Sequence, residues 1–335
     1  MVFLSCLSMV SPLGYSVDST CAALRAKISA FAELRYQDDL GEPIVGAIIP
    51  DLPWEMRGRA RLVAIAQLVL ESLDAELGSH LPWGHMPLIL CTRESARPGP
   101  HLGGIVAELQ FPHDTTFGGA QAVHIASGHV AAFEGVERAR RLLAVDGEEA
   151  CLILAVDSLI DARTLSWLDG NSRLKTSAQT DGIIPGEAGC LALATLRPHA
   201  PGHVVVKGIG LATEAATVLN DEPLRAEGLT VALREALREA GIGLHDVDFR
   251  LSDVAGESYA FEELVLAQTR LMRKVRPSQP LWHPADCIGD CGAAAGLVQL
   301  AWAGQAFQRD YAPGPLAALH GSSVFGARAA AVVGH

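Results

Sequence analysis

One nine-residue stretch decides the fold of this chain: Asp181-Gly182-Ile183-Ile184-Pro185-Gly186-Glu187-Ala188-Gly189. It is the most specific string in the sequence, and it leads into an apolar run over residues 190–195 that predicts a buried strand. Glycine adopts backbone conformations that other residues avoid. We therefore expect its three glycines to form tight or left-handed turns, a structural role that is needed whether or not the protein carries out a reaction.

Helical and strand patterns alternate on both sides of this stretch. We expect helices over residues 61–77, 129–143, 224–240, 259–274 and 292–307, and strands over 86–91, 120–125, 150–156, 190–195, 204–211, 247–251, 316–320 and 328–333. Helices between buried strands predict an α/β architecture with helices on both faces of the sheets. The second part of the chain repeats the pattern of the first, which predicts two duplicated halves, residues 1–200 and 201–335, packed as one unit.

The composition excludes several classes of protein. Of 335 residues, 49% are hydrophobic and 19% are charged, which is typical of a globular chain with a large core. A net charge of −12 without any basic run would repel phosphate backbones, so we expect no nucleic-acid partner. No apolar run approaches the roughly 18 residues of a membrane span, so we expect no membrane insertion.

The cysteines and the N-terminus indicate the cellular compartment. Seven cysteines are scattered along the chain, mostly in apolar runs, which fits a reducing cytosol better than a disulfide framework. The apolar start lacks a basic n-region and runs into Ser11-Pro12-Leu13-Gly14, which favours a first strand and turn over a signal peptide. We therefore expect a cytoplasmic protein.

Three segments resemble motifs of the β-ketoacyl synthases, members of the thiolase-like superfamily, in the family's order and separation. Residues 125–128 (Ile-Ala-Ser-Gly) resemble the nucleophile elbow, and residues 181–189 resemble the Asp-Gly-Phe-Val-x-Gly-Glu-Gly segment. Residues 288–296 resemble the Ile-Gly-His turn and the glycine–alanine start of the helix that follows it. The resemblance spans nearly the whole chain and implies a five-layer αβαβα thiolase-like fold with two duplicated halves.

The same resemblance implies that the reactive groups are missing. Decarboxylating condensation in this family uses a cysteine thiolate at a helix N-terminus, two histidines and a supporting lysine. The matching positions here are Ile125, Asp253, Asp290 and Ala285. Isoleucine is no nucleophile, and an ionised aspartate only accepts hydrogen bonds, so it cannot stabilise an enolate. We therefore expect no catalytic residues of the family type, and no cofactor.

Other residues offer weaker candidates for a site. We expect Ser127 to be the N-cap of a helix rather than a substitute nucleophile. The implied fold would bring three carboxylates together where the family has its active site: Asp253, Glu257 and Asp290. They could have raised pKa values and act as acid and base. We prefer the alternative that the two aspartates accept hydrogen bonds from backbone amides at helix starts.

Two further clusters of candidate residues lie close together in sequence. His113, His124 and His129 lie near the elbow, but their spacing alone forms no triad. His283, Cys287 and Cys291 lack a usual zinc spacing, so we expect no metal.

Details of several segments resemble a narrower group: short, catalytically degenerate ketosynthase-like proteins that accompany type VI secretion effectors. These segments include residues 158–161, 281–289 and 311–315. This resemblance implies a binding or adaptor protein that holds a secretion effector or its adaptor. Two alternatives stay open: an acyl-thioester transferase or hydrolase with a relocated active site, and a non-catalytic partner of a true ketosynthase. We also expect a homodimer, formed through the edge strand that ends at Ile125.

Overall fold

A single mixed sheet of ten strands forms the centre of the molecule, in the order β10-β9-β11-β12-β8-β1-β7-β6-β4-β5. The computed structural model describes residues 1–73, 86–111, 122–198 and 203–335. The first half of the chain contributes β1 (Val2–Val10), β4 (Leu88–Thr92), β5 (Ala122–Ala126), β6 (Ala150–Ser158) and β7 (Glu187–Thr195). The second half contributes β8 (Val204–Thr213), β9 (Phe249–Ser252), β10 (Leu281–Trp282), β11 (Leu316–Ser322) and β12 (Ala327–Gly334).

The two sets of five strands have the same internal order. Counted along the chain within each set, the strands lie in the order third, second, fourth, fifth, first, and the fifth strand is antiparallel to its neighbours. The sets meet where β1 pairs antiparallel with β8 over Val2–Leu4. The repeat is therefore visible in the strand order. The boundary expected at residue 200 stays a prediction, because residues 199–202 lie outside the described part.

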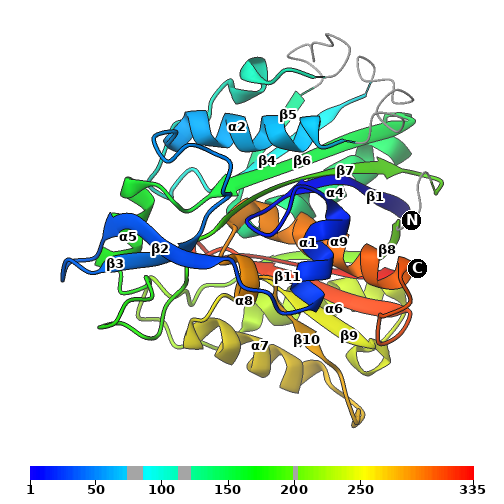
Figure 1. Cartoon of the computed structure of the whole chain (residues 1–335). Coiled ribbons are helices and arrows are strands. Elements are labelled where there is room, and N and C mark those ends of the chain that lie inside the picture. The colour runs from blue at the N-terminus through cyan, green and yellow to red at the C-terminus, as the bar shows by residue number, and fades with distance from the viewer. Residues whose placement is uncertain (74–85, 112–121, 199–202) are drawn as a thin grey trace.

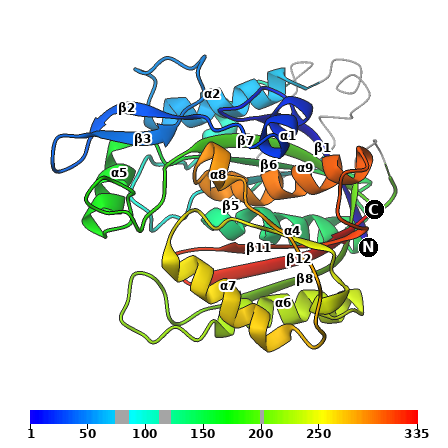
Figure 2. The ribbon, with the colours of Figure 1, turned by 60° about the horizontal axis from the view of Figure 1, so that its bottom comes forward.

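The sheet folds back on itself, so that its halves face each other across two central helices, α4 (Ala131–Ala144) and α9 (Ala295–Gln308). The helix α2 (Gly58–Glu71) covers the outer face of the first half, and α6 (Glu227–Ala240) and α7 (Ser258–Leu271) cover the second (Figure 2). The layers therefore alternate helix, sheet, helix, sheet, helix, and the expected five-layer αβαβα fold is confirmed.

Burial follows from this layering. Along β12, Ala329, Ala331 and Val333 face the central core, whereas Ala330 and Val332 face the outer core beneath α6. This is the period of two that a strand imposes on its side chains. The helix α9 lies between both halves and is buried at every position except its last, which explains its run of glycine, alanine and other apolar residues.

Several element boundaries differ from the expected ones. The helix expected to end at residue 274 ends at Leu271, because Met272 has an extended backbone. The hairpin of β2 (Phe31–Gln37) and β3 (Pro43–Ala47) was not expected; it forms a separate two-stranded sheet at the edge of the molecule (Figure 1). Among the described residues, no helix has the length and apolar character that crossing a membrane would need.

The stretch 181–189 joins segments from both halves of the chain. Gly186 N donates to Asp290 O at 2.8 Å, and Asp290 N donates to Ile184 O at 2.8 Å. A Cβ atom on Gly186 would lie 2.1 Å from the carbonyl oxygen of Ile288. None of the three glycines of the stretch has a positive φ, so the expected left-handed turns are wrong. These glycines are needed because other chain segments approach them closely.

Glu187 anchors the same stretch to its surroundings through a fully buried carboxylate. Arg61 of α2 donates to it twice, at 2.7 and 2.6 Å, and this pair is almost completely buried. The backbone amide of Ile49 and the hydroxyl of Ser158 each donate to it at 2.8 Å. A buried carboxylate is tolerated only when its oxygens accept hydrogen bonds in this way. Glu187 therefore fixes α2, the backbone at Ile49 and the end of β6 relative to one another.

Gly186→Ala should destabilise the protein by several kcal/mol, because the new Cβ would displace the backbone of residues 288–290. The matched control is Gly170→Ala, near the end of the helix α5 (Ala162–Gly170), where a Cβ atom meets nothing within 4 Å. That control should change the free energy of unfolding by less than about 1 kcal/mol. Urea unfolding of both variants measures the difference, and equal values would contradict the role given to Gly186.

Candidate functional site

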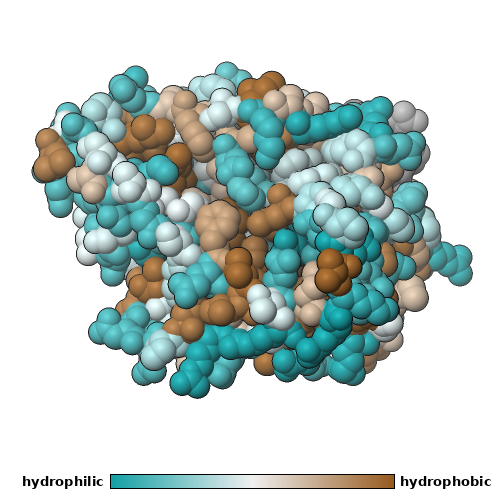
Figure 3. All heavy atoms as spheres, turned by 90° about the horizontal axis from the view of Figure 1, so that it is seen from below, coloured by the Kyte–Doolittle hydropathy of each residue, from teal (hydrophilic) through white to brown (hydrophobic). Residues whose placement is uncertain are grey.

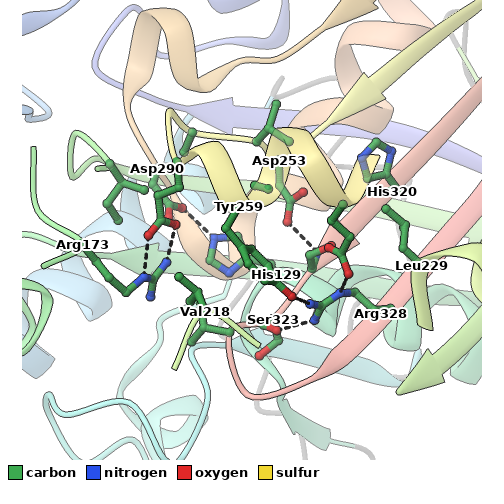
Figure 4. A pocket seen from close by; sticks show the side chains of 18 residues that line it. His129, Arg173, Val218, Leu229, Asp253, Tyr259, Asp290, His320, Ser323 and Arg328 are labelled. Carbon is green, nitrogen blue, oxygen red and sulfur yellow. Dashed lines mark hydrogen bonds and ion pairs between the residues drawn. The ribbon is translucent and has the colours of Figure 1, made fainter. Parts of the chain in front are cut away.

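Asp253 and Asp290 line one small polar cavity between the two halves, together with Glu257 (Figure 4). The cavity has a volume of about 40 Å³, which is room for only a few water molecules. Pockets that hold organic ligands are roughly ten times larger. Ile125 does not line this cavity. It lies within β5, opposite Cys91, and packs against the central core.

Asp290 is held by the stretch 181–189 and by the start of the helix that follows it. Its Oδ1 accepts from Gly292 N at 2.9 Å, as expected for a carboxylate at a helix start, and from His129 Nε2 at 2.7 Å. Burial alone would raise the pKa of Asp290, but the neighbouring His129 outweighs burial and lowers it. Asp290 is therefore an ionised carboxylate with a fixed partner.

His129 belongs to the short 3₁₀ turn η4 (Gly128–Val130) that opens α4. Its Nδ1 lies 3.9 Å from the carboxylate of Glu94, on the side opposite Asp290. Burial would lower the pKa of His129, but Asp290 and Glu94 raise it well above its ordinary value. The buried imidazole is therefore an imidazolium between two carboxylates, and a cation of this kind is a poor general base.

Glu94 completes this buried network, and sequence reasoning missed it. Burial would raise the pKa of Glu94, but His129 and Arg97 lower it to about 2. Ser323 Oγ donates to its Oε1 at 2.8 Å, which links the loop after β4 to the loop after β11. Arg97 in turn pairs with the buried Asp157. The one sequence signal was the unusual density of charge at residues 93–97, next to an apolar strand.

The turn from β5 into α4 is made by Gly128, not by Ile125. Gly128 has φ = +59°, and a Cβ atom there would lie 2.0 Å from the carboxylate of Glu94. The second half repeats this arrangement: Gly292 has φ = +52°, and its Cβ would lie 2.1 Å from the carboxylate of Asp157. At each helix start a carboxylate therefore fills the space that a side chain would occupy.

Asp253 has a pKa that is raised toward neutral pH. Burial of its carboxyl raises the pKa to about 6, and the charge of Asp290 adds to this effect. Its Oδ2 accepts from Ser322 N at 2.7 Å, in the second half's closing hairpin rather than at a helix start. Glu257 is occupied by a bidentate pair with Arg173, at 2.7 Å for both bonds. The three carboxylates do converge, as expected, but two of them are fully paired.

The remaining candidates have structural partners. Ser127 lies at the N-cap position, but its hydroxyl donates to Glu134 at 2.6 Å and caps no backbone amide. His124 bonds Thr92 at 2.7 Å, away from His129. His113 lies outside the described residues.

The His-Cys-Cys cluster, for which we expected no metal, and the position that matches the family's lysine also have structural surroundings. His283 bonds Asp286 at 2.9 Å, and Cys287 and Cys291 are buried. Ala285 begins the short helix α8 (Ala285–Ile288). Within the described part of the chain, no three potential metal ligands come together.

These contacts define a thiolase-like fold whose central site is filled by paired charges. No family model and no curated protein matches the sequence. Solved structures do match: a ketosynthase/chain length factor for ishigamide has a TM-score of 0.74 at 16% identity, covering 99% of this chain and 98% of that one. A ketosynthase in complex with its chain length factor from Xenorhabdus doucetiae has a TM-score of 0.76 at 15% identity, with coverages of 99% and 97%. At this identity the likeness establishes the ketosynthase fold alone.

Gly128→Ala should cost several kcal/mol of stability, because the Cβ atom would enter the space of the Glu94 carboxylate. Gly104→Ala is the matched control, because φ there is also positive, at +70°, and the surrounding space is open. That control should cost only the roughly 1–2 kcal/mol of a left-handed backbone. Equal decreases in the free energy of unfolding of the two variants would show that the Glu94 side chain can move away from a Cβ atom at residue 128 at no cost.

Asp253→Asn should stabilise the protein more at pH 8 than at pH 5. The folded pKa of Asp253 is raised, so the protonated carboxyl contributes stability at low pH that is lost as the pH rises through about 6. Asparagine keeps an acceptor for Ser322 N and carries no charge. We expect a gain of about 1–3 kcal/mol at pH 8.

The exposed Asp146→Asn serves as the control for the loss of one negative charge. Unfolding curves at pH 5 and pH 8 measure the difference for both variants. A gain for Asp253→Asn that is larger at pH 5 than at pH 8 would contradict the raised pKa.

Proposed function

We propose that this chain is a non-catalytic thiolase-fold protein of the cytoplasm that acts by binding another protein. The observation that carries this proposal is the buried network at the start of α4, where the Glu94 carboxylate fills the space next to Gly128. His129 is engaged by Asp290 at 2.7 Å, and the position that matches the family's nucleophile is Ile125, so this turn offers neither a family-type nucleophile nor a free histidine. The cavity of about 40 Å³ leaves no room for an acyl chain.

The type of partner follows from the resemblance stated for the sequence. We propose a type VI secretion effector or its adaptor, held before secretion. The surface offers apolar contacts for such a role: α7, at the bottom of Figure 1, exposes Phe261 and Val265, and Figure 3 shows apolar side chains gathered in the middle of that lower face. Exposed apolar groups with a polar rim are typical of interaction surfaces.

The second candidate is a non-catalytic partner of a ketosynthase. Two of the similar solved structures are described as a ketosynthase with a chain length factor, and another is a ketosynthase with an acyl carrier protein. The strand β5 lies at one edge of the ten-stranded sheet, where its outer side pairs with no described strand. An edge of this kind can accept a strand from a second chain, which also supports the proposed homodimer.

Acyl and malonyl thioesters should leave no covalent adduct on the protein and should not be decarboxylated. Intact mass spectrometry and release of CO₂ measure this, with an active ketosynthase run in parallel. Six of the seven cysteines are buried, and burial raises the pKa values of their thiols. Ile125→Cys should stay inert as well, because Asp253 and Asp290 stand at the positions of the family's histidines and their carboxylates donate no hydrogen bond to a thioester carbonyl. An adduct at Ser127, Thr92 or any cysteine would support a relocated active site.

The oligomeric state tests the proposed homodimer, and the partner recovered from the host distinguishes the two binding roles. Light scattering at micromolar concentration should show a homodimer if the edge of β5 pairs two copies, and a monomer would remove that proposal. Tagged protein recovered from its native host should bring down a secretion effector or adaptor, and Asp290→Ala should not abolish this capture. Recovery of an intact ketosynthase would instead favour the second candidate, and loss of all partners with the pocket variant would contradict a surface role.

A further inference from the structure

A second pocket lies on the surface, along α1 (Val17–Arg25) and beside the C-terminal end of α9. These two helices pack against each other (Figure 1). Its volume is about 670 Å³, within the range of ligand-binding pockets. It shares no lining residue with the cavity around Asp290. Two arginines, an aspartate, a glutamine and a tyrosine line it, together with Ala22 and Ala26.

Arg25 supplies a positioned and unpaired cation in this pocket. Its guanidinium lies 4.4 Å from the centre of the Tyr311 ring, so that the ring face holds it in place. Among the described residues it forms no hydrogen bond and no ion pair, in contrast to Arg309, which pairs with Asp18 at 2.9 Å. A guanidinium with free donors matches a carboxylate, because two parallel N–H groups meet two oxygens.

Gln305 supplies an acceptor in the same pocket. Its side chain is 6% exposed, and its amide group donates to Asp18. Its Oε1 has no hydrogen-bond partner among the described residues. A buried carbonyl without a donor costs roughly 1–3 kcal/mol, which a ligand N–H group reaching it would recover. The pocket therefore offers a cation and a hydrogen-bond acceptor, which fit a ligand that carries both an anionic group and an N–H donor.

We propose that this pocket binds the C-terminal carboxylate of a partner protein. The carboxylate pairs with Arg25, the last backbone N–H faces Gln305, and the last side chain lies against Ala22 and Ala26. The exposed rim leaves room for the rest of a chain to continue outward, which an enclosed small-molecule site would not. The proposal deepens the binding role proposed above by naming the part of the partner that is recognised.

The test uses fluorescent hexapeptides whose last two residues are varied, each made with a free carboxylate and as the C-terminal amide. Fluorescence anisotropy should find free acids that bind, with their amides at least about tenfold weaker. Arg25→Gln and Gln305→Met should each weaken the best free acid by about tenfold. Arg238→Gln removes an exposed surface arginine elsewhere and should have no effect. Thermal unfolding checks that all three variants are folded.

Three outcomes would overturn the proposal: amides that bind as tightly as acids, no binding by any peptide, or N-acetylated single amino acids that bind as tightly as hexapeptides. The last would show a site for small carboxylates. Failure here is distinguishable from failure of the binding role as a whole. If Arg25→Gln still recovers the same partner from the native host as the unchanged protein does, the binding role stands and the C-terminal contact is wrong.

Discussion

The two hydrogen bonds between residues 184–186 and residues 288–290 are the interaction on which the rest of the site depends. They join a segment of the first half to a segment of the second, and the glycine at position 186 allows the backbones to meet. Through them Asp290 is placed at the start of the central helix α9, within reach of His129. The same stretch continues into Glu187, whose buried pair with Arg61 fastens it to the outer helix α2. One short stretch therefore sets both the packing of the halves and the position of the central charges.

The central site contains a network of buried charges with fixed partners. Removing charges from water is costly, and a buried ion is retained only where fixed partners offset that cost. Here the partners come from both halves: Glu94 and His129 from the first, Asp290 and Ser323 from the second. Such a network orients the halves relative to each other.

The two halves contain equivalent glycine turns at the starts of their central helices. At Gly128 and at Gly292, a left-handed turn brings a helix N-terminus close to a carboxylate, Glu94 in one half and Asp157 in the other. Asp157 accepts from the backbone amide of Ala293 at 2.9 Å, which satisfies one of the free amides of that helix start. The positive end of the helix dipole is thus used to stabilise a protein carboxylate. In a thiolase-like enzyme the corresponding field would act on a thiolate.

The alternation of buried strands and helices was enough to predict an α/β architecture from the sequence, because burial on both faces of a sheet leaves a continuous apolar pattern. The five layers were implied by the resemblance of three segments, including the stretch 181–189, to the β-ketoacyl synthases. That Ile125 stands at the position of the family's nucleophile follows from the sequence alone, because the resemblance aligns residues 125–128 with the nucleophile elbow. Only the tertiary structure decided which residue makes the turn, because a positive φ and a close approach at Gly128 leave no mark in the local pattern. It alone brought Glu94 to His129 and Arg25 to Tyr311, because contacts between distant segments depend on how the layers pack. The pKa values of Asp253 and Asp290 are shifted in opposite directions for the same reason. Both carboxyls are buried, but only Asp290 has His129 as a direct partner, and that contact is set by the packing.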